Sequence, residues 1–396
     1  MRVPFNIAQL AGKELEYIQE SVANRHISGD GQFSKKCHQW LTEVVGTPKA
    51  LLTHSCTGAL EMAAILLDLK PGDEVIMPSF TFSSTANAFV LRGAVPVFVD
   101  IRPDTLNIDE NLIERAITPR TKAIAVVHYA GVACEMDKIM AVAEKHNLKV
   151  VEDAAQAILS TYKGKQLGTI GHLAALSFHE TKNLTAGECG ALLINDSAYA
   201  KRAEIIREKG TNRSAFFRGE VDKYTWVDAG SSYLPSELQA AFLYAQFESA
   251  HEITKDRLSI WHRYHELLEP LEKRGLIRRP IIPDHCEQNA HLYYLLAPSA
   301  DRRDAMLFYL KQQDVGALFH YIPLHSAPAG RRFGRTDGEL PVTDRLSASL
   351  LRLPFWRGLA PEQIEYVVRC IGDFFKRSPD HASSDKRKSE VAEVSS

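Results

Sequence analysis

One lysine and one aspartate of this chain are placed where their side chains could support cofactor chemistry. Lys182 lies in the run Ser177-Phe-His-Glu-Thr-Lys-Asn-Leu-Thr-Ala-Gly-Glu-Cys-Gly190, and Asp153 ends the mostly apolar segment Val150-Val-Glu-Asp153. A lysine amine can hold an aldehyde cofactor as a Schiff base, and a carboxylate can keep a pyridine nitrogen protonated so that the ring accepts electrons. A surface position is the ordinary alternative for any one lysine. The combination suggests pyridoxal phosphate.

A second motif has the residue types of a phosphate seat. Ser55-Cys-Thr-Gly-Ala-Leu60 follows a predicted strand over 50–53 and begins a helix that runs through 61–67. Small residues at a helix N-terminus expose backbone N–H groups, and hydroxyls beside them add further donors to a phosphate. An ordinary strand-to-helix turn with a Ser or Thr cap has the same pattern, so both interpretations stay open.

Two aromatic residues and a later polar turn could line a site. Pro78-Ser-Phe-Thr-Phe-Ser-Ser-Thr85 follows a predicted strand, and we assign Phe82 to stacking on a flat ring and Phe80 to the core. His320-Tyr-Ile-Pro-Leu-His325 forms a rigid turn around its proline. His320, Tyr321 and His325 are therefore candidates for substrate contact, with partly buried histidines as the alternative.

The elements that must position these residues follow an alternating pattern. Short β-rich runs separated by helical stretches predict βαβ units and a mainly parallel sheet, an α/β fold. An open sheet of this kind binds its ligand at the carboxyl ends of the strands. The predicted strands cover residues 50–53, 74–77, 96–100, 123–128, 149–152, 174–178 and 191–195.

The second half of the chain predicts a smaller α+β unit after a long helix. Ser236 caps an amphipathic stretch over 237–272, and Asp109 caps an earlier helix over 109–116. Beyond the long helix we expect strands over 288–298 and 315–320 and helices over 303–313 and 361–376. We therefore expect a large domain over 1–248, a small domain over 249–376 and a disordered tail over 377–396, which is rich in Ser, Lys and Glu.

The composition of the chain predicts which classes of partner it lacks and in which cellular compartment it lies. The 396 residues carry 47 Lys and Arg against 49 Asp and Glu, a net charge of -2 without a dense basic stripe, which predicts no nucleic-acid partner. The longest nearly apolar run, 123–133, is too short to cross a bilayer, so we expect no membrane association. Six scattered cysteines without a Cys-x-x-Cys pair or a leader before Met1 predict reduced thiols and a cytoplasmic protein.

Other cofactor motifs are missing from the sequence. There is no Gly-x-Gly-x-x-Gly after a strand, no Walker loop, no His-Glu-x-x-His and no Gly-x-Ser-x-Gly. His285, Cys286 and His291 lie close together in sequence, but they lack a fourth ligand and make a poor zinc site. We therefore predict no metal.

Taken in order, the quoted motifs resemble the DegT/DnrJ/EryC1/StrS family of sugar aminotransferases, which has the aspartate aminotransferase fold. The likeness extends from Val3 to about Phe375. It implies a pyridoxal phosphate-dependent enzyme of fold type I, with a large mainly parallel sheet domain and a smaller α+β C-terminal domain. The residues that carry it are Ser55-x-Thr-Gly58, Phe82, Asp153-Ala-Ala-Gln156, Ser177-Phe178 and Lys182-Asn183 followed by Gly187-Glu-x-Gly190.

The resemblance assigns roles to individual residues. It implies that Lys182 is the Schiff-base lysine and that Asp153 pairs with the pyridinium nitrogen. Phe82 is then expected to stack on the cofactor ring, and Gln156 to lie near the ring hydroxyl. The residues expected to hold the phosphate are Thr57, Gly58, Ser177 and, from the neighbouring subunit, Ser232.

Two positions depart from the pattern of the broader family. Ser232 and Leu234 replace the Asn and Arg that are usual there, which affects the expected phosphate contact between subunits. Cys189 replaces a glycine in the form Gly-Glu-Gly-Gly and is expected to crowd the loop that follows the lysine.

Four stretches narrow the resemblance to family members that serve enterobacterial common antigen synthesis, namely 75–82, 128–136, 207–214 and 319–325. The family resemblance itself implies a homodimer with shared active sites that takes an amino group from glutamate. The implied acceptor is dTDP-4-dehydro-6-deoxy-D-glucose, and the implied product is dTDP-4-amino-4,6-dideoxy-D-galactose.

Several alternatives remain beside this interpretation. The enzyme could act on another keto nucleotide sugar. A sugar 3-dehydratase of the same fold has His in place of the Schiff-base lysine, so Lys182 argues against it. A non-catalytic nucleotide-sugar sensor would need neither Lys182 nor Asp153. A nicotinamide-dependent oxidoreductase lacks support because no glycine-rich fingerprint is present.

Overall fold

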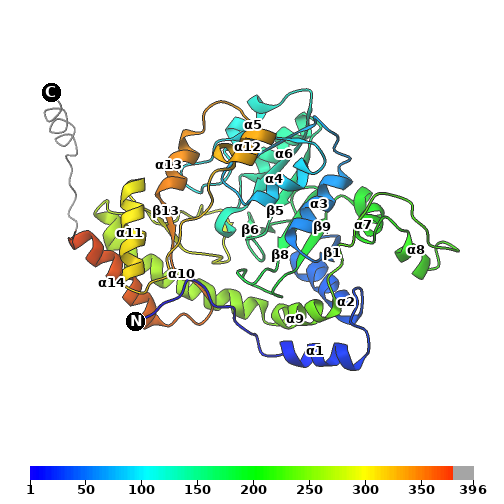
Figure 1. Ribbon diagram of the computed structural model, residues 1–396, viewed down its shortest axis with the longest axis horizontal. Coiled ribbons are helices and arrows are strands. Elements are labelled where there is room, and N and C mark those ends of the chain that lie inside the picture. Colours follow the sequence, from blue (N-terminus) through cyan, green and yellow to red (C-terminus); the bar gives the residue numbers. More distant parts are fainter. Residues whose placement is uncertain (378–396) are drawn as a thin grey trace, which may run out of the picture.

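The computed structural model describes residues 1–377, and its largest element is an eight-stranded sheet (Figure 1). The strand order is β1-β9-β8-β5-β4-β2-β3-β12. Every neighbouring pair from β12 to β8 is parallel, whereas β9 runs antiparallel to both β8 and β1. The sheet is therefore mainly parallel, as predicted.

All seven predicted strands are present, each within two residues of its expected bounds. The short edge strand β12 was not predicted, because it comes from the second half of the chain and pairs with β3. The strands are β1 Lys49–Thr53, β2 Glu74–Pro78, β3 Val95–Val99, β4 Thr121–Val127, β5 Lys149–Asp153, β8 Leu173–Ser177, β9 Gly190–Ile194 and β12 Arg335–Thr336.

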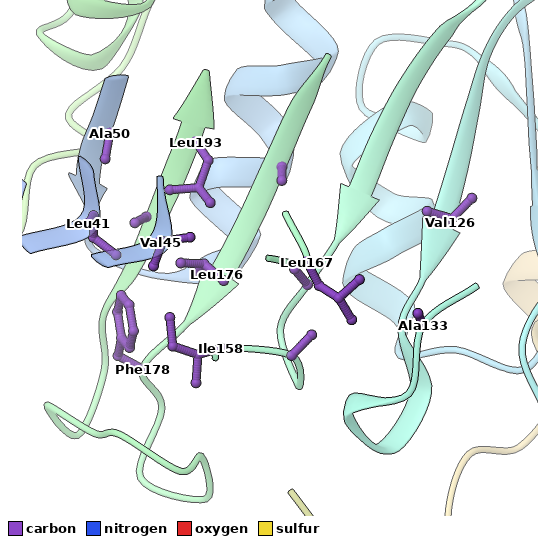
Figure 2. Close-up of a cluster of buried hydrophobic side chains, with 14 of the residues drawn as sticks. Leu41, Val45, Ala50, Val126, Ala133, Ile158, Leu167, Leu176, Phe178 and Leu193 are labelled. Carbon is purple, nitrogen blue, oxygen red and sulfur yellow. The ribbon is translucent and has the colours of Figure 1, made fainter. Parts of the chain in front are cut away.

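Helices cover both faces of this sheet. One face packs against α1 Glu14–Ala23, α2 Gln32–Trp40, α5 Glu110–Ala116, α6 Met136–Lys145 and α9 Glu237–Glu248, and the other against α3 Cys56–Leu66, α4 Ser83–Val90 and α7 Ala200–Arg207. Successive strand residues alternate between the two cores, as Val150 and Val151 do. Figure 2 shows part of the first core, where Leu41 and Val45 lie beside Ala50, Leu176 and Leu193.

Polar caps start several helices as the sequence predicted. The Asp109 side chain accepts from the Asn111 amide at the start of α5, and Ser236 forms a reciprocal capping box with Gln239 at the start of α9. The single long helix predicted over 237–272 is wrong: α9 ends at Glu248 and α10 covers Ala250–Lys273. At Ser249, φ and ψ of -104° and 9° leave the helical region, so α9 can pack on α1 and α2 while α10 reaches α14.

A separate core lies in the C-terminal part of the chain, built on α10, α11 Ala300–Gln312 and α14 Pro361–Arg377. Helix α13 Pro341–Ser349 packs on α11. The two-stranded antiparallel sheet of this core consists of β11 Tyr294–Leu296 and β13 Leu350–Arg352. Val3 is fully buried in this core, because its backbone pairs with residues 314–316. The division into domains at residue 248 stays a prediction.

Of the two strands predicted in this part, one is much shorter than expected and the other does not form. Within 288–298 only β11 is a strand, and within 315–320 the backbone makes only isolated bridges, Val315 with Val3 and Leu318 with Arg352. The partners of both segments lie far away in the sequence, so no local pattern fixes the length of pairing.

Short elements complete the chain. They are α8 Arg213–Phe217, α12 Pro328–Phe333, the π-helix η1 Leu41–Val45, the 3₁₀ helices η2 Tyr129–Gly131, η3 Ser197–Tyr199 and η4 Leu324–Ser326, and the small sheet of β6 Thr161–Tyr162, β7 Lys165–Gln166 and β10 Cys286–Glu287. Arg377, the first residue of the predicted tail, ends α14, and residues 378–396 lie outside the described residues. None of the helices between residues 1 and 377 has the length and apolar character that a membrane crossing needs.

Candidate active site

The predicted site residues lie around one edge of the large sheet. Asp153 ends β5 and Ser177 ends β8, and these neighbouring strands are parallel. The segment that begins at His128 follows the parallel neighbour β4. Their carboxyl ends therefore meet at the same edge, where the α/β architecture binds its ligand.

Asp153 is a buried carboxylate whose position is fixed by neutral donors. Its side chain is almost fully enclosed, with 5% exposure. Thr85 Oγ1 donates to Asp153 Oδ2 at 2.6 Å, and the amide of Ala155 donates to Oδ1 at 3.1 Å. Among the described residues no Lys, Arg or His nitrogen lies within 4 Å of it. The carboxyl group is thus oriented, and its oxygens have no cationic partner among the described residues.

Lys182 lies in the loop between β8 and β9, within electrostatic range of Asp153. Its backbone amide donates to the carbonyl of His179 at 2.9 Å, which forms a turn within the loop. Burial lowers the pKa of the Lys182 amine, while the thiol of Cys56 and the carboxylate of Asp153 act in the opposite direction. A lowered pKa increases the neutral, nucleophilic fraction of the amine. The amine is therefore suited to bond to an aldehyde.

The N-terminus of α3 provides donors near this pair. Ser55 caps the helix by accepting from the amide of Gly58 at 3.1 Å, and Thr57 Oγ1 lies 2.8 Å from Ser84 Oγ on α4. A Cβ at position 58 would stand 2.6 Å from the His54 ring, so any larger residue would require the exposed His54 side chain to move. Ser177 is buried at the end of β8. Hydroxyl groups from α3, α4 and β8 thus lie near the backbone amides at the N-terminus of α3.

Cys189 does not crowd the loop that follows Lys182. Its side chain is buried in the core on one face of the sheet, and its thiol donates to the carbonyl of Thr53 at 3.3 Å. The next residue, Gly190, is the one with little room, because a Cβ there would stand 2.4 Å from the amide of Cys56. The expectation of crowding by Cys189 is therefore wrong, and the narrow position is one residue later.

The two phenylalanines before α4 differ in burial, as predicted. Phe80 is buried, with 1% exposure, and its ring centroid lies 5.0 Å from Tyr129. Phe82 is 59% exposed, and its ring centroid lies 6.3 Å from Tyr321. Phe80 is confirmed as a core residue, and the stacking role of Phe82 stays a prediction that its exposed ring permits.

Gln156 links the sheet edge to the C-terminal part of the chain. Its Oε1 accepts from the amide of Ala130 at 2.6 Å, and its Nε2 donates to the hydroxyl of Tyr321 at 2.7 Å. Burial raises the pKa of the Tyr321 phenol, and the carboxylate of Asp153 adds to this effect. Tyr321 therefore lies within electrostatic range of Asp153, and its hydroxyl is neutral.

The other two residues of the predicted substrate turn have different surroundings. His320 stacks on Tyr321 with a centroid distance of 3.7 Å, and its Nδ1 lies 2.8 Å from the Tyr129 hydroxyl. Burial lowers the pKa of His320 well below its ordinary range, so the ring is neutral. His325 lies 2.7 Å from Ser79 Oγ through Nδ1 and 3.3 Å from Asp344 through Nε2. His325 thus fastens the turn to the chain before Phe80.

Ser232 is not brought to the other candidates within one chain. It is exposed, and its backbone forms an isolated bridge with Glu208. Within residues 1–377, no hydrogen bond joins its side chain to Lys182, Asp153 or Thr57. The candidate zinc residues are also separated, since His285 pairs with Glu135 and His291 with Asn183.

Sequence reasoning missed three residues of the site. Thr85 was quoted in a motif without a role, yet it holds Asp153. Tyr129 is fully buried and contacts His320, and Arg352 lies within electrostatic range of Lys182. A single charged residue in the apolar run Leu350-Leu-Arg-Leu353 was the available signal for Arg352.

The residues present fit pyridoxal phosphate. The buried Asp153 carboxylate has no cationic partner among residues 1–377, so it can pair with a protonated ring nitrogen. Lys182 has a lowered pKa, the start of α3 offers amides and hydroxyls to a phosphate, and Phe82 has a free ring face. Each part of the cofactor thus has a chemically matched group at this edge.

Comparison with known structures defines the class: the chain is a pyridoxal phosphate-dependent aminotransferase of fold type I. The Streptococcus pneumoniae protein Spr1654 in its PLP form superposes with a TM-score of 0.88 at 25% identity, covering 95% of this chain and 99% of that chain. The chain belongs to the DegT/DnrJ/EryC1/StrS aminotransferase family, whose model matches residues 8–372.

Two relatives have names that refer to sugars. The spore coat polysaccharide biosynthesis protein SpsC of Bacillus subtilis is 33% identical over 382 residues, covering 94% of this chain and 97% of SpsC. The GDP-perosamine synthase of Caulobacter vibrioides is 31% identical over 377 residues, covering 93% of this chain and 97% of the synthase. The predicted family, fold, cofactor and enzyme class are confirmed.

Proposed function

We propose that this enzyme moves an amino group from glutamate to C4 of dTDP-4-dehydro-6-deoxy-D-glucose, giving dTDP-4-amino-4,6-dideoxy-D-galactose. The observation that carries amino transfer is the Lys182 amine within electrostatic range of the buried, oriented Asp153 carboxylate. Similarity to a relative named GDP-perosamine synthase supports a nucleotide-sugar acceptor. The choice of the dTDP sugar rests on the resemblance of the stretches 75–82, 128–136, 207–214 and 319–325.

Two side chains of this site handle protons in the reaction. Bound pyridoxal phosphate supplies an aldehyde carbon that takes up nitrogen and a ring that accepts the electron pair left on carbon when a proton departs. Lys182 Nζ removes the proton from the α-carbon of the donor, because its lowered pKa leaves the amine free to act as a base. Asp153, oriented by Thr85, keeps the ring nitrogen protonated.

The remaining predicted residues hold the cofactor in place. Thr57 and Gly58 at the start of α3, together with Ser177, bind the phosphate. Phe82 stacks on the ring, and Gln156 lies near the ring hydroxyl. None of these side chains has a carboxylate that would repel the phosphate.

The turn at His320 and Tyr321 encloses the acceptor side of the site. His320 is neutral and packs on Tyr129 and Tyr321, so its ring can exchange hydrogen bonds with a sugar hydroxyl without attracting a counter-ion. The hydroxyl of Tyr321 accepts from Gln156, which holds this turn against the sheet edge.

We also propose a homodimer in which Ser232 binds the phosphate of the partner's site. The segment 211–231, which includes α8, projects at the side of the molecule opposite α11 and α14 (Figure 1). It exposes Phe217 at 68% and Trp226 at 78%, an apolar surface beside Ser232 that a second copy would cover.

The substrate is tested by incubating the enzyme with glutamate and a panel of dTDP-, GDP- and UDP-linked keto sugars, with products identified by NMR. The expected product carries an axial C4 amine on a dTDP-linked 6-deoxyhexose. Exclusive turnover of a GDP or UDP sugar would replace the proposed acceptor, and an equatorial amine would correct the product. Lys182→Ala should abolish turnover, whereas Lys165→Ala, which removes an exposed lysine on β7, should leave it unchanged.

A further inference from the structure

Three consecutive residues of the C-terminal part, 289–291, pack against the edge of the large sheet that carries the candidate site. Asn289 is fully buried, and its Nδ2 donates to the carbonyls of Gln156 and Ile158 at 2.9 and 2.8 Å. Both carbonyls belong to the chain that follows Asp153 at the end of β5. The 289–291 segment is therefore fastened to the part of the chain that carries Asp153.

The same segment holds the residue that follows Lys182. Asn183 is buried, its Nδ2 donates to the carbonyl of Asn289 at 2.8 Å, and its Oδ1 lies 2.9 Å from His291 Nδ1. Both the nitrogen and the oxygen of the Asn183 amide thus contact one segment. The backbone next to Lys182 is consequently tied, through 289–291, to the chain after Asp153.

These hydrogen bonds also determine which ring nitrogen of His291 carries the proton. Because the Asn183 NH₂ group donates to a carbonyl, the Asn183 oxygen is the atom that accepts, so His291 Nδ1 must be the donor. Burial lowers the pKa of His291 well below its ordinary range, and neighbouring cationic side chains act in the same direction. The ring is therefore neutral, and its Nδ1 proton is available to Asn183.

Helix α10 also holds the 289–291 segment. Arg257 is buried, and its Nε and Nη2 donate to the carbonyls of Ala290 and His291 at 3.0 and 2.7 Å. Ala290 has a φ of 52°, a left-handed conformation that a residue with a Cβ keeps only where its surroundings hold it. The support for Asn183 is therefore itself fixed by several independent contacts.

We propose that Asn183 is a positioning residue that holds the Lys182 amine at a fixed separation from Asp153, an inference that rests on the proposed role of Lys182. The aldehyde carbon and the ring nitrogen of pyridoxal phosphate lie at opposite ends of one rigid ring. The amine and the carboxylate can engage both ends at once only if their separation matches the ring. Hydrogen bonds within the loop of Lys182 cannot set this separation, because they join the loop to itself. Those of Asn183 can, since they lead through Asn289 to the chain after Asp153.

The test follows how the uptake of pyridoxal phosphate by the cofactor-free, full-length chain depends on pH. Burial is the main cause of the lowered pKa of Lys182. Cys56 and Asp153 favour the ammonium form, and Arg352 disfavours it. Asn183→Ala frees the loop, exposes the amine to water and returns its pKa toward 10.5. The midpoint of the uptake rate should therefore move up by about one pH unit or more.

Two replacements of His291 test which ring nitrogen is used. His291→Asn keeps an N–H close to the position of Nδ1, whereas His291→Gln places one close to the position of Nε2. His291→Asn should keep the midpoint near that of the unaltered enzyme, and His291→Gln should move it up as Asn183→Ala does. The opposite order would show that Asn183 does not depend on the Nδ1 proton and would overturn the inference.

Asn195→Ala is the matched control. Asn195 Nδ2 donates to the carbonyls of Gly168 and Gly171 at 2.9 Å each, so it also fastens two parts of the chain. It follows β9 at the opposite edge of the sheet, because β9 runs antiparallel to β8. This variant should lose thermal stability while the uptake midpoint stays unchanged. An unchanged midpoint in Asn183→Ala as well, with a native circular dichroism spectrum, would overturn the inference.

Borohydride treatment of each holoenzyme separates this inference from the proposed role of Lys182. The reagent reduces the C=N bond between the cofactor and its lysine to a stable single bond, and mass spectrometry of the peptides then identifies that lysine. Cofactor on another lysine of the unaltered enzyme would refute the proposed role of Lys182. Cofactor on Lys182, with unshifted midpoints in Asn183→Ala and His291→Gln, would refute the positioning role alone.

Discussion

Asp153 is oriented before any ligand binds, because Thr85 and the amide of Ala155 occupy one position on each of its oxygens. Thr85 is itself 2.7 Å from Thr81, so the support extends back toward β2. An acceptor held this way need not reorganise when a protonated ring nitrogen forms beside it. The sequence indicated Asp153 by its place at a strand end, but Thr85 comes from a different element and only the fold brings them together.

Replacing Asp153 tests this support directly. Asp153→Asn should reduce the rate roughly a thousandfold, because the amide cannot hold the ring nitrogen protonated. Thr85→Val removes one hydrogen bond to a charged group and should cost about tenfold or more in kcat with little change in KM. In the double variant, the Thr85 effect should largely disappear. Additive losses in steady-state kinetics would show that Thr85 acts independently of Asp153.

The lowered pKa of Lys182 predicts how cofactor uptake depends on pH. Only the neutral amine attacks an aldehyde, and burial shifts its pKa down from 10.5, so the neutral form predominates from a lower pH. The rate at which cofactor-free enzyme takes up pyridoxal phosphate should rise with pH and level off below 10.5. Asp153→Asn should move this midpoint further down, since it removes a carboxylate that favours the ammonium. Stopped-flow absorbance measures both, and an upward shift would contradict the interpretation.

At the scale of elements, local sequence patterns were enough to predict most strands of the large sheet. Runs such as 149–152 are short, apolar and bounded by polar or small residues, so their strands could be located without a partner. The small sheet differs, because β11 and β13 are three residues each and pair over a long stretch of sequence. The sequence also did not predict the break between α9 and α10 at Ser249, because helical periodicity continues on both sides of this residue.

Contacts between helices that are distant in sequence are equally invisible to local patterns. Glu237 of α9 is buried and accepts the amides of Gly31, Phe33 and Ser34 at 3.0, 2.8 and 2.9 Å. The Ser34 hydroxyl donates to the same carboxylate. A side chain of α9 therefore caps the N-terminus of α2, which has no cap of its own.

Glu237→Gln should accordingly destabilise the protein by roughly 3 kcal/mol or more, because an amide NH₂ would face backbone donors in a buried site. Urea denaturation followed by circular dichroism measures the loss. Glu248→Gln, in the same helix, alters an exposed carboxylate that accepts from Tyr17 and should cost about 1 kcal/mol or less. Equal losses for both variants would show that the contact with α2 adds nothing.

At the scale of the whole molecule, a single chain leaves part of the proposed site incomplete. Ser232 is exposed, and the neighbouring segment presents Phe217 and Trp226 to solvent. The sequence could indicate Ser232 only through resemblance, since a contact between two copies leaves no pattern within one of them.

Paired replacement of these aromatics tests the proposed dimer. Phe217→Ser combined with Trp226→Ser should shift sedimentation toward the monomer and weaken cofactor retention, since the partner's Ser232 would be lost from the phosphate. Phe308→Ser removes a comparably exposed aromatic from α11 and should change neither property. A dimer that survives the double replacement would place the interface elsewhere.

The pairing of Val3 with residues 314–316 also has a consequence for biosynthesis. Residues 3–5 leave the ribosome well before the segment 260–375 that encloses Val3 and the carbonyl of Phe5. Residues 3–5 are therefore uncovered until the segment 260–375 has been translated. Docking of residues 3–5 therefore follows synthesis of that segment, and a molecule bound to residues 3–5 would delay closure of the C-terminal core.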